Sequence, residues 1–417
     1  MAFTGGASSS PILESKSIPE QIGVSVHFRT PLPDGGWSVD DQQLKEYEAQ
    51  MDQIVELGVK NVRFDNAWQW TDKKKGKYDF APHHRIMDAL KKRGLRAVTL
   101  LVFHDPRFEA KLSIQTQQGR DAYAEFCGQI VGEFKGQNVV WEMWNEPNIP
   151  GFWESGINAE EYMKAAKAAM IAMRKADPEC LIVGPASCTI DVPFLQVCIR
   201  DGLLDLVSAV SVHSYCEAPE VMFSKYLHLR NLMGSGNIPI MCSECGFSQV
   251  FIGTGSRIRS EDEQASLVTR SVLVDLMSGI PLHIIYTNRD YTDKFASNED
   301  RYGFCTRDGR PKRAFYAVQN LVGKLKNAQF VRRLTAGSVD IFEESPGDYV
   351  AEFSDNESRI LVGWTTGEPH DVKVSLEDAP TAESNLYGES LPVPEVKEKF
   401  VKMGLSQSPI YLTIKRK

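Results

Sequence analysis

The chain has 417 residues, of which 42% are hydrophobic and 24% are charged, so it is large enough to bury a full core and is not a disordered or fibrous protein. Its formal net charge of −8, without a long lysine or arginine block, disfavours nucleic acid and anionic lipid as partners. Its apolar runs fall well short of the roughly 20 residues that cross a bilayer. The composition therefore predicts a globular protein without a membrane segment.

The first 19 residues are rich in Gly and Ser and contain no cationic head followed by an apolar stretch. We expect a flexible segment over residues 1–19. We also expect a cytoplasmic location if the chain is full length, and a secreted or periplasmic one if a signal was trimmed. Eight cysteines are too sparse and too irregularly spaced for a disulfide framework, which predicts free thiols.

From about residue 20 to 327 the sequence repeats one pattern, in which a short β-rich apolar run is followed by an amphipathic helix. The predicted strands are residues 23–28, 60–64, 96–103, 139–144, 181–184, 207–213, 239–244 and 282–286. The predicted helices are residues 40–57, 82–93, 119–134, 159–177, 191–201, 219–232, 261–279 and 311–327. Eight such units favour a closed (β/α)8 barrel, a TIM barrel in the α/β class, over an open doubly wound sheet.

After about residue 328 the helical period is lost. Short β-rich runs at 349–353, 359–365, 372–374 and 410–414 are separated by Gly, Pro, Asp and Asn turns. This pattern predicts a small, sandwich-like all-β domain over residues 328–417, following a barrel over residues 20–327. We expect this domain to pack against the barrel and to contribute stability more than chemistry.

Polar and aromatic residues end most of the predicted barrel strands. Active sites of such barrels form where the carboxyl ends of the strands meet, so these residues are expected to share one mouth. They are His27, Arg63, Asp65, His104, Asn145, Glu146, His213, Tyr215, Glu244, Tyr286 and Asn288.

Two of these residues, Glu146 and Glu244, follow apolar runs, where an exposed charge has no packing role. The fourth and seventh strands lie nearly across the mouth from each other. Two carboxyls about 5–5.5 Å apart are what retaining glycoside hydrolysis needs, with one as nucleophile and the other as acid and then base. The alternative is a pair of buried structural carboxylates held by arginine.

The segments Trp144–Asn148, at the end of the fourth strand, and Glu244–Gly246, at the end of the seventh, resemble the paired signature of the clan A glycoside hydrolases. Within the clan the chain is most similar to family 39 and its relatives, through the barrel, the trailing β domain, and residues 213–215, 302–304 and 308–312. The resemblance covers about residues 20–417. It implies a retaining β-glycosidase acting on a β-linked oligo- or polysaccharide, with no cofactor and no metal.

The resemblance also implies roles for individual residues. Glu146 is expected as general acid/base, Glu244 as nucleophile, and Asn145 as a donor to the sugar 2-hydroxyl. Arg63 matches the clan arginine beside the nucleophile, where a guanidinium lowers the pKa of the carboxyl and keeps it ionised.

Further substrate contacts are expected around this pair. His213 and Tyr215 would face the subsite of the cleaved sugar, and Tyr286 stands where the clan often has a stacking tryptophan. The remaining candidates for sugar contact, each with a structural role as the alternative, are His27, His104, Trp153 and the pair Trp68 and Trp70.

Cys242 and Cys245 form a Cys-x-x-Cys pair around Glu244. A second such pair is absent, and strand alternation points the side chains apart, so no metal or redox role is expected. Two alternatives to hydrolysis stay open: a transglycosidase with the same covalent intermediate, and a non-catalytic carbohydrate-binding barrel. The sequence does not predict the sugar, the linkage, endo or exo action, or the oligomeric state.

Overall fold

The computed structural model describes residues 13–14, 17–28, 38–72, 76–251, 256–334, 336–338 and 347–416, so most of the expected flexible segment 1–19 lies outside the described residues. Eight parallel strands close into a barrel in the order β1-β10-β7-β6-β5-β4-β3-β2, which confirms the predicted (β/α)8 fold. The strands are β1 (Ile22–Ser25), β2 (Asn61–Ala67), β3 (Arg96–Val102), β4 (Val140–Met143), β5 (Leu181–Cys188), β6 (Ala209–His213), β7 (Ile240–Cys245) and β10 (His283–Ile285).

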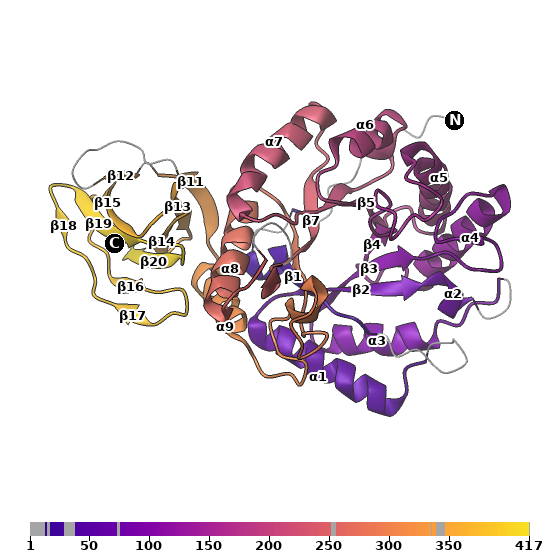
Figure 1. Cartoon of the computed structure of the whole chain (residues 1–417), viewed down its shortest axis with the longest axis horizontal. Coiled ribbons are helices and arrows are strands. Elements are labelled where there is room, and N and C mark those ends of the chain that lie inside the picture. Colours follow the sequence, from indigo (N-terminus) through magenta and orange to yellow (C-terminus); the bar gives the residue numbers. More distant parts are fainter. Residues whose placement is uncertain are drawn as a thin grey trace.

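Helices lie around these strands (Figure 1). They are α1 (Asp41–Leu57), α2 (Trp68–Thr71), α3 (Ala81–Lys92), α4 (Gln117–Glu133), α5 (Ala159–Ala176), α6 (Val192–Arg200), α7 (Met222–Met233), α8 (Glu261–Met277) and α9 (Arg313–Leu325). Short 3-10 turns occur at Ile18–Gln21, Leu203–Asp205, Pro219–Val221 and Asn298–Arg301. The one-turn helix α2 and the hairpin of β8 (Val250–Phe251) and β9 (Arg257–Ile258) were not predicted, because elements this short carry no periodic signal.

The lower half of the barrel interior is filled by apolar side chains. One buried cluster combines residues from the first halves of the strands, among them Val98, Val140, Ala209 and Met241. This end of the barrel is therefore packed with side chains rather than hollow, and the buried Asn61 at the start of β2 donates to the carbonyls of Glu20 and Ile22.

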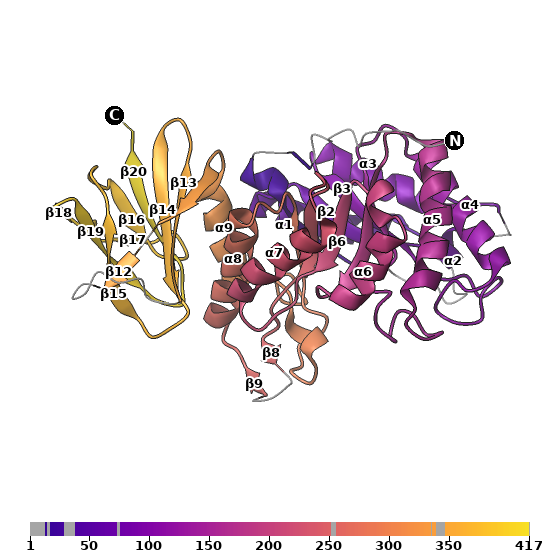
Figure 2. The ribbon, with the colours of Figure 1, turned by 90° about the horizontal axis from the view of Figure 1, so that it is seen from above.

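The C-terminal part of the chain forms two antiparallel sheets. The larger has the order β11-β13-β14-β20-β16-β17 and the smaller the order β12-β15-β19-β18. Their strands are β11 (Gln329–Arg333), β12 (Ala336–Ser338), β13 (Asp348–Ser354), β14 (Ser358–Thr365), β15 (His370–Ser375), β16 (Ala382–Ser384), β17 (Ser390–Leu391), β18 (Val396–Lys397), β19 (Phe400–Leu405) and β20 (Ile410–Lys415). A buried cluster that includes Val350, Leu361, Val374 and Met403 draws on both sheets, so the expected sandwich is present (Figure 2).

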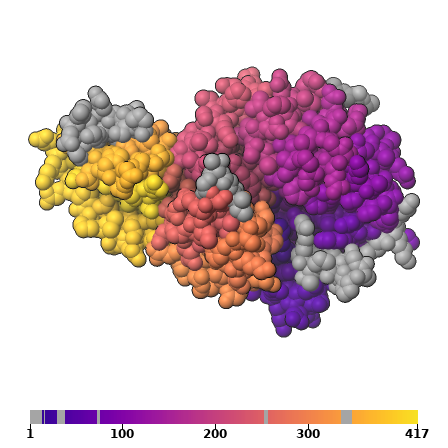
Figure 3. Space-filling view, viewed as in Figure 1, coloured from indigo at the N-terminus to yellow at the C-terminus, as the bar shows by residue number. Residues whose placement is uncertain are grey.

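The sandwich packs beside α7, α8 and α9 of the barrel, and Figure 3 shows it as a separate lobe. Side chains of the larger sheet, such as Phe353 and Trp364, belong to the same buried cluster as the barrel helices. Gln329 begins the first strand outside the barrel, while the exact division at residues 327 and 328 stays a prediction.

Candidate active site

Glu146 lies just beyond β4, in a tightly bent segment. Trp144 and Glu146 both have positive φ angles, of 65° and 46°, which are uncommon for residues other than glycine. The bend is held in place because the Glu146 backbone N–H donates to the Ala186 carbonyl at 2.9 Å and the Trp144 indole N–H donates to the Phe152 carbonyl at 2.8 Å. Strained backbone that surrounding contacts hold is common at functional sites.

Glu244, near the end of β7, has a donor on each carboxylate oxygen. Arg63 Nη1 forms an ion pair with Oε2, and the Tyr215 hydroxyl donates to Oε1 at 2.8 Å. Burial alone would raise the pKa of Glu244, but the charges of His213 and Arg63 and the hydrogen bond from Tyr215 outweigh burial and hold this pKa below its ordinary value. Glu244 is therefore ionised and suited to act as a nucleophile.

His213, at the end of β6, links the two glutamates. Its Nδ1 lies 2.7 Å from Glu146 Oε1 and 3.7 Å from Glu244 Oε1, while its Nε2 lies 3.2 Å from Arg63 Nη2. Burial lowers the pKa of His213, but the charge of Glu244 and the hydrogen bond to Glu146 outweigh burial and raise it, which favours the charged ring. Because a guanidinium can only donate, Nε2 accepts from Arg63 when the ring is neutral, and in either state Nδ1 carries a proton that it donates to Glu146.

The two carboxyls, from the ends of β4 and β7, lie close together in the barrel mouth. One side-chain ligand atom from each of Glu146, His213 and Glu244 lies within 4.8 Å of the others, so the two carboxylate groups are close neighbours. The exposed fraction of Glu146 is 8%, and Glu244 is partly buried. Such proximity suits a retaining pair, since an inverting pair stands roughly 6.5–9.5 Å apart to admit a water molecule.

Arg63 is buried beneath the pair and joins four side chains. It donates through Nε to Glu142 Oε2 at 2.7 Å and through Nη2 to Asn145 Oδ1 at 3.2 Å, in addition to its contacts with Glu244 and His213. Burial lowers the pKa of Arg63, but the charges of Glu142 and Glu244 outweigh burial and raise it. Sequence reasoning missed Glu142, although a single carboxylate within the apolar run of β4 was a usable signal.

Tyrosines form one wall of the mouth. The rings of Tyr215 and Tyr286 each lie edge-on to Tyr302, with centroid separations of 6.0 and 5.3 Å. The Tyr286 hydroxyl lies 2.9 Å from the Tyr291 hydroxyl and donates to Glu299 Oε2 at 3.3 Å. Their contacts hold Tyr286 and Tyr215 near Glu244.

Glu299 and Tyr302 were not among the predicted site residues. Burial, and next the charge of Glu244, raises the pKa of Glu299, which places this third carboxyl within electrostatic reach of the nucleophile. Both residues belong to the long segment after β10, where no strand pattern points to the mouth.

His27 lies on the same side as Tyr286. Its ring is 5.9 Å from that of Tyr286 and 5.3 Å from that of Tyr291, and its Nδ1 lies 3.7 Å from Asp65 Oδ2. His27 also contributes to the low pKa of Glu244, so the structure brings it to the candidate site.

His104, after β3, faces a different set of groups. Burial lowers its pKa, and the charges acting on it come from Glu154, Asp105 and Glu109. No described contact joins His104 to Glu146 or Glu244, so its expected sugar contact stays a prediction.

The expected sugar-stacking role of Trp153 is wrong. Its side chain is 1% exposed and packs edge-on between Trp144, at 5.4 Å, and Tyr162, at 5.9 Å. The loop after β4 folds back, with the Trp153 backbone N–H donating to the Ile149 carbonyl, and this fold turns the indole into the core. A sugar ring cannot reach it.

The same correction applies to Trp68, which is fully buried and stacks on Phe108 with a centroid separation of 5.3 Å. Trp70 is partly buried against the core, and its expected contact with sugar stays a prediction.

The cysteines are free, as the sequence predicts. The expectation that Cys242 and Cys245 point apart is wrong, because their sulfur atoms lie within 4.8 Å of each other and of a ring nitrogen of His283. No helix in the described residues has the length and apolar character to cross a bilayer.

Comparison with known proteins agrees with this arrangement. The family model described as cellulase (glycosyl hydrolase family 5) matches residues 13–268, which is more than half of the chain. The chain belongs to this family of clan A glycoside hydrolases. The predicted membership of clan A is thereby confirmed.

Two curated relatives are β-xylosidases. Over 108 residues the chain is 35% identical to that of Caldicellulosiruptor saccharolyticus, and over 94 residues it is 39% identical to that of Geobacillus stearothermophilus. These alignments cover 22% and 21% of this chain, and only 21% and 18% of the respective relatives.

Solved structures show the same fold over nearly the whole chain. A family 39 glycoside hydrolase from Bacteroides cellulosilyticus WH2 superposes with a TM-score of 0.76 at 20% identity, covering 96% of this chain and 82% of that one. A family 39 β-xylosidase from Caulobacter crescentus superposes with a TM-score of 0.64 at 16% identity, covering 96% and 98%. The likeness to family 39 is therefore one of fold, while the matching family model is that of family 5.

Proposed function

We propose that this chain is a retaining β-glycosidase in which Glu244 is the nucleophile and Glu146 is the general acid and base. The observation that carries the proposal is the asymmetry between two neighbouring carboxyls. Glu244 has Arg63 and Tyr215 as donors and a lowered pKa, whereas Glu146 receives its hydrogen bond from His213.

In the first step Glu244 attacks the anomeric carbon and the bond from that carbon to the glycosidic oxygen breaks. Glu146 gives its proton to the departing oxygen. Because Glu146 Oε1 accepts the hydrogen bond from His213, the proton for the leaving group is carried on Oε2.

In the second step Glu146, now ionised, takes a proton from water, and the resulting hydroxide oxygen bonds to the anomeric carbon. The ester bond to Glu244 breaks, and the sugar leaves with its original anomeric configuration. Arg63 and Tyr215 stabilise the Glu244 carboxylate as it is released, since both donate to it.

We propose β-linked xylosides as the substrate class to test first. The support is that both curated relatives and one of the solved structures are named β-xylosidases. Asn145, Tyr286 and His27 are the candidates for contact with the sugar, because they lie beside the carboxyl pair or its tyrosine wall.

The test compares Glu244→Gln and Glu146→Gln on two substrates: an aryl β-xyloside with a leaving group that needs no proton, and β-1,4-xylobiose. We expect Glu244→Gln to lose turnover on both. We expect Glu146→Gln to lose about 10²–10⁴-fold on xylobiose and much less in the first step with the aryl glycoside. Glu133→Gln, on the exposed surface of α4, is the control.

A proton NMR time course of the wild-type reaction gives the anomer of the first-formed sugar, and we expect the β anomer. First formation of the α anomer, or equal losses in both variants on both substrates, would contradict the assignment. Retention of glycan without any turnover would favour the binding-barrel alternative. Transfer of xylose to added acceptor sugars in preference to water would favour the transglycosidase.

A further inference from the structure

Behind the candidate active site, on the outer face of the barrel wall, three potential metal ligands come together. One atom from each of Cys242 and Cys245 on β7 and His283 on β10 lies within 4.8 Å of the other two. Their exposed fractions are 0%, 2% and 1%. The apolar side of the same wall is formed by inward-facing residues such as Met241 and Ile284, so this cluster is separate from the barrel mouth.

An irregularity in β7 places both thiols on one side. In a regular strand, residues three positions apart face opposite sides of the sheet. Here Cys242 pairs with His283 and Cys245 pairs with Ile285, so three steps along β7 correspond to two along β10. The extra residue is a β-bulge, and it turns Cys245 toward the side of Cys242.

His283 is oriented as a metal-binding histidine would be. Its Nδ1 lies 2.6 Å from Asp275 Oδ2 on α8, and its Nε2 is buried with no oxygen or nitrogen partner and lies beside the Cys242 thiol. A carboxylate on one ring nitrogen leaves the other nitrogen with its lone pair directed outward, which is the usual arrangement behind a metal-ligating histidine. A buried nitrogen left without a partner is otherwise costly.

The thiols interact mainly with each other and with His283, and their contacts with backbone oxygens are long. Cys242 Sγ lies 3.7 Å from the Glu244 carbonyl oxygen, and Cys245 Sγ lies 3.5 Å from the Ser214 carbonyl oxygen. Sulfur is a weak donor, so these contacts do little to satisfy the cluster.

We propose that Cys242, Cys245 and His283 bind one thiophilic divalent cation, with Zn²⁺ the best match, and that this ion stabilises the bulged end of β7. Two thiolates and one imidazole are the ligands that Zn²⁺ prefers, whereas Ca²⁺ and Mg²⁺ prefer oxygen. Water or one of the two neighbouring carbonyl oxygens would complete a tetrahedral set. The proposal does not depend on the proposed function, and it departs from the expectation that no metal is involved.

A disulfide explains the cluster less well. The bulge brings the Cα atoms of Cys242 and Cys245 to a span of two steps of β10, roughly 6.6 Å at about 3.3 Å per residue, which is close to the upper limit of about 7 Å for disulfide-linked Cα atoms. A metal ion joins two sulfur atoms at about 2.3 Å each and does not require the S–S contact. It also gives His283 Nε2 a partner, which a disulfide does not.

The test uses the whole chain, reduced and freed of metal by a chelator, and titrated with Co²⁺ as a spectroscopic probe and with Zn²⁺. We expect about one Co²⁺ per chain with intense thiolate-to-cobalt charge-transfer absorption, displaced by Zn²⁺. We expect the melting temperature to rise with added Zn²⁺, because the ion binds the folded state.

Cys242→Ser and His283→Gln should lose this absorption and the rise in melting temperature. Cys198→Ser, which removes a fully buried thiol of α6 outside the cluster, should keep both. Circular dichroism shows whether each variant folds, and Cys245→Ser replaces either variant that does not. The titration of the wild type tests the proposal without any variant.

The proposal is overturned if the folded, reduced wild type takes up no Co²⁺ with thiolate absorption, or if Cys242→Ser and His283→Gln bind Co²⁺ as the wild type does. It is equally overturned if the protein binds no metal and mass spectrometry finds a Cys242–Cys245 disulfide. None of these readouts requires enzymatic turnover, so their failure is distinct from failure of the proposed function.

Discussion

Tyr215, two residues after β6, and Arg63, on β2, each donate to a different oxygen of Glu244. Arg63 carries a full charge but is shared with Glu142, while Tyr215 gives its hydroxyl hydrogen bond to Glu244 at 2.8 Å. Removing Arg63 would leave Glu142 buried and unpaired and would disturb the whole site. Tyr215 therefore offers the cleaner test of how donors control the nucleophile.

Replacing Tyr215 with phenylalanine should lower kcat/KM by about 10- to 100-fold, because a hydrogen bond to a charged group contributes roughly 1.5–3 kcal/mol. It should also shift the pH profile. The hydrogen bond lowers the pKa of Glu244, so its loss raises that pKa. Since Glu244 must be ionised to attack, the acidic limb of kcat/KM should move to higher pH, as measured with an aryl β-xyloside.

Tyr316→Phe, on the exposed face of α9, is the control and should leave the profile unchanged. An acidic limb that stays in place in Tyr215→Phe, despite the lower rate, would mean that the hydroxyl contacts substrate and does not set the ionisation of Glu244.

Substitutions of Trp153 test whether its indole packs in the core or stacks on the sugar. Because it is buried against Trp144 and Tyr162, Trp153→Ala should lower the free energy of unfolding by about 3–5 kcal/mol. Trp153→Phe should lose less stability and keep the KM of the wild type. A raised KM for xylobiose in Trp153→Phe, with stability unchanged in urea, would restore the stacking role.

At the scale of elements, the N-terminus of α8 is stabilised by a capping interaction that the sequence encodes locally. Ser260 accepts from the Glu263 backbone N–H at 3.1 Å, and the Glu263 side chain accepts from the Ser260 N–H at 2.8 Å. This capping box begins the helix that carries Asp275.

Ser260→Ala should destabilise the protein by about 1 kcal/mol, whereas Ser260→Gly should cost only a few tenths, because glycine is also tolerated at this position. Urea unfolding followed by circular dichroism gives both values. Equal losses in the two variants would contradict this prediction, because both lack the hydroxyl of Ser260 and only glycine is favoured at an N-cap position.

The barrel strands could be predicted because each is a short apolar run. Glu146 and Glu244 could be predicted as site residues because each carboxylate ends such a run. Strands that are defined only by their backbone pairing with a neighbouring strand could not be predicted. β11 has mostly exposed residues, and β16, β17 and β18 have two or three residues each. The bulge that joins Cys242 to Cys245 depends on the register with β10, which no local pattern in β7 contains. The burial of Trp153 depends likewise on how its loop folds back.

At the scale of the whole molecule, the junction between barrel and sandwich combines a buried ion pair with stacked rings. Glu220, before α7, forms two hydrogen bonds of 2.7 Å with Arg270 on α8 and accepts from the Trp364 indole at 2.8 Å. Trp364 stacks on Tyr349 at 5.1 Å, and Tyr349 stacks on Phe223 at 5.8 Å. One carboxylate thus joins two barrel elements to the larger sheet.

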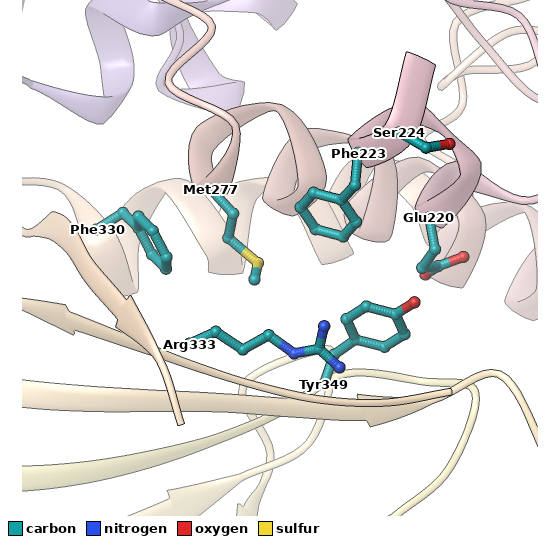
Figure 4. A pocket seen from close by; sticks show the side chains of 7 residues that line it. All are labelled: Glu220, Phe223, Ser224, Met277, Phe330, Arg333 and Tyr349. Atoms are coloured by element: carbon teal, nitrogen blue, oxygen red, sulfur yellow. The ribbon is translucent and has the colours of Figure 1, made fainter. Parts of the chain in front are cut away.

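A cavity of about 410 Å³ lies in this junction, and Figure 4 shows its lining side chains on both sides. They come from the barrel and from the sheet: Glu220, Phe223, Ser224, Met277, Phe330, Arg333 and Tyr349. Arg333 lies over the Tyr349 ring at 4.4 Å. The side chains of the barrel and of the sheet leave this part of the junction open, and the Glu220 contacts bridge it directly.

Glu220→Gln should destabilise the protein by about 3–5 kcal/mol, because it leaves the buried Arg270 without its carboxylate partner. Urea unfolding followed by tryptophan fluorescence measures the loss. Glu377→Gln, which removes an exposed ion pair with Lys399, is the matched control and should change stability by at most about 1 kcal/mol.

Because the sandwich shares one buried cluster with the barrel, unfolding should stay a single transition in the control. If Glu220→Gln unfolds in two steps with the barrel transition unchanged, the sandwich contributes little to the stability of the barrel.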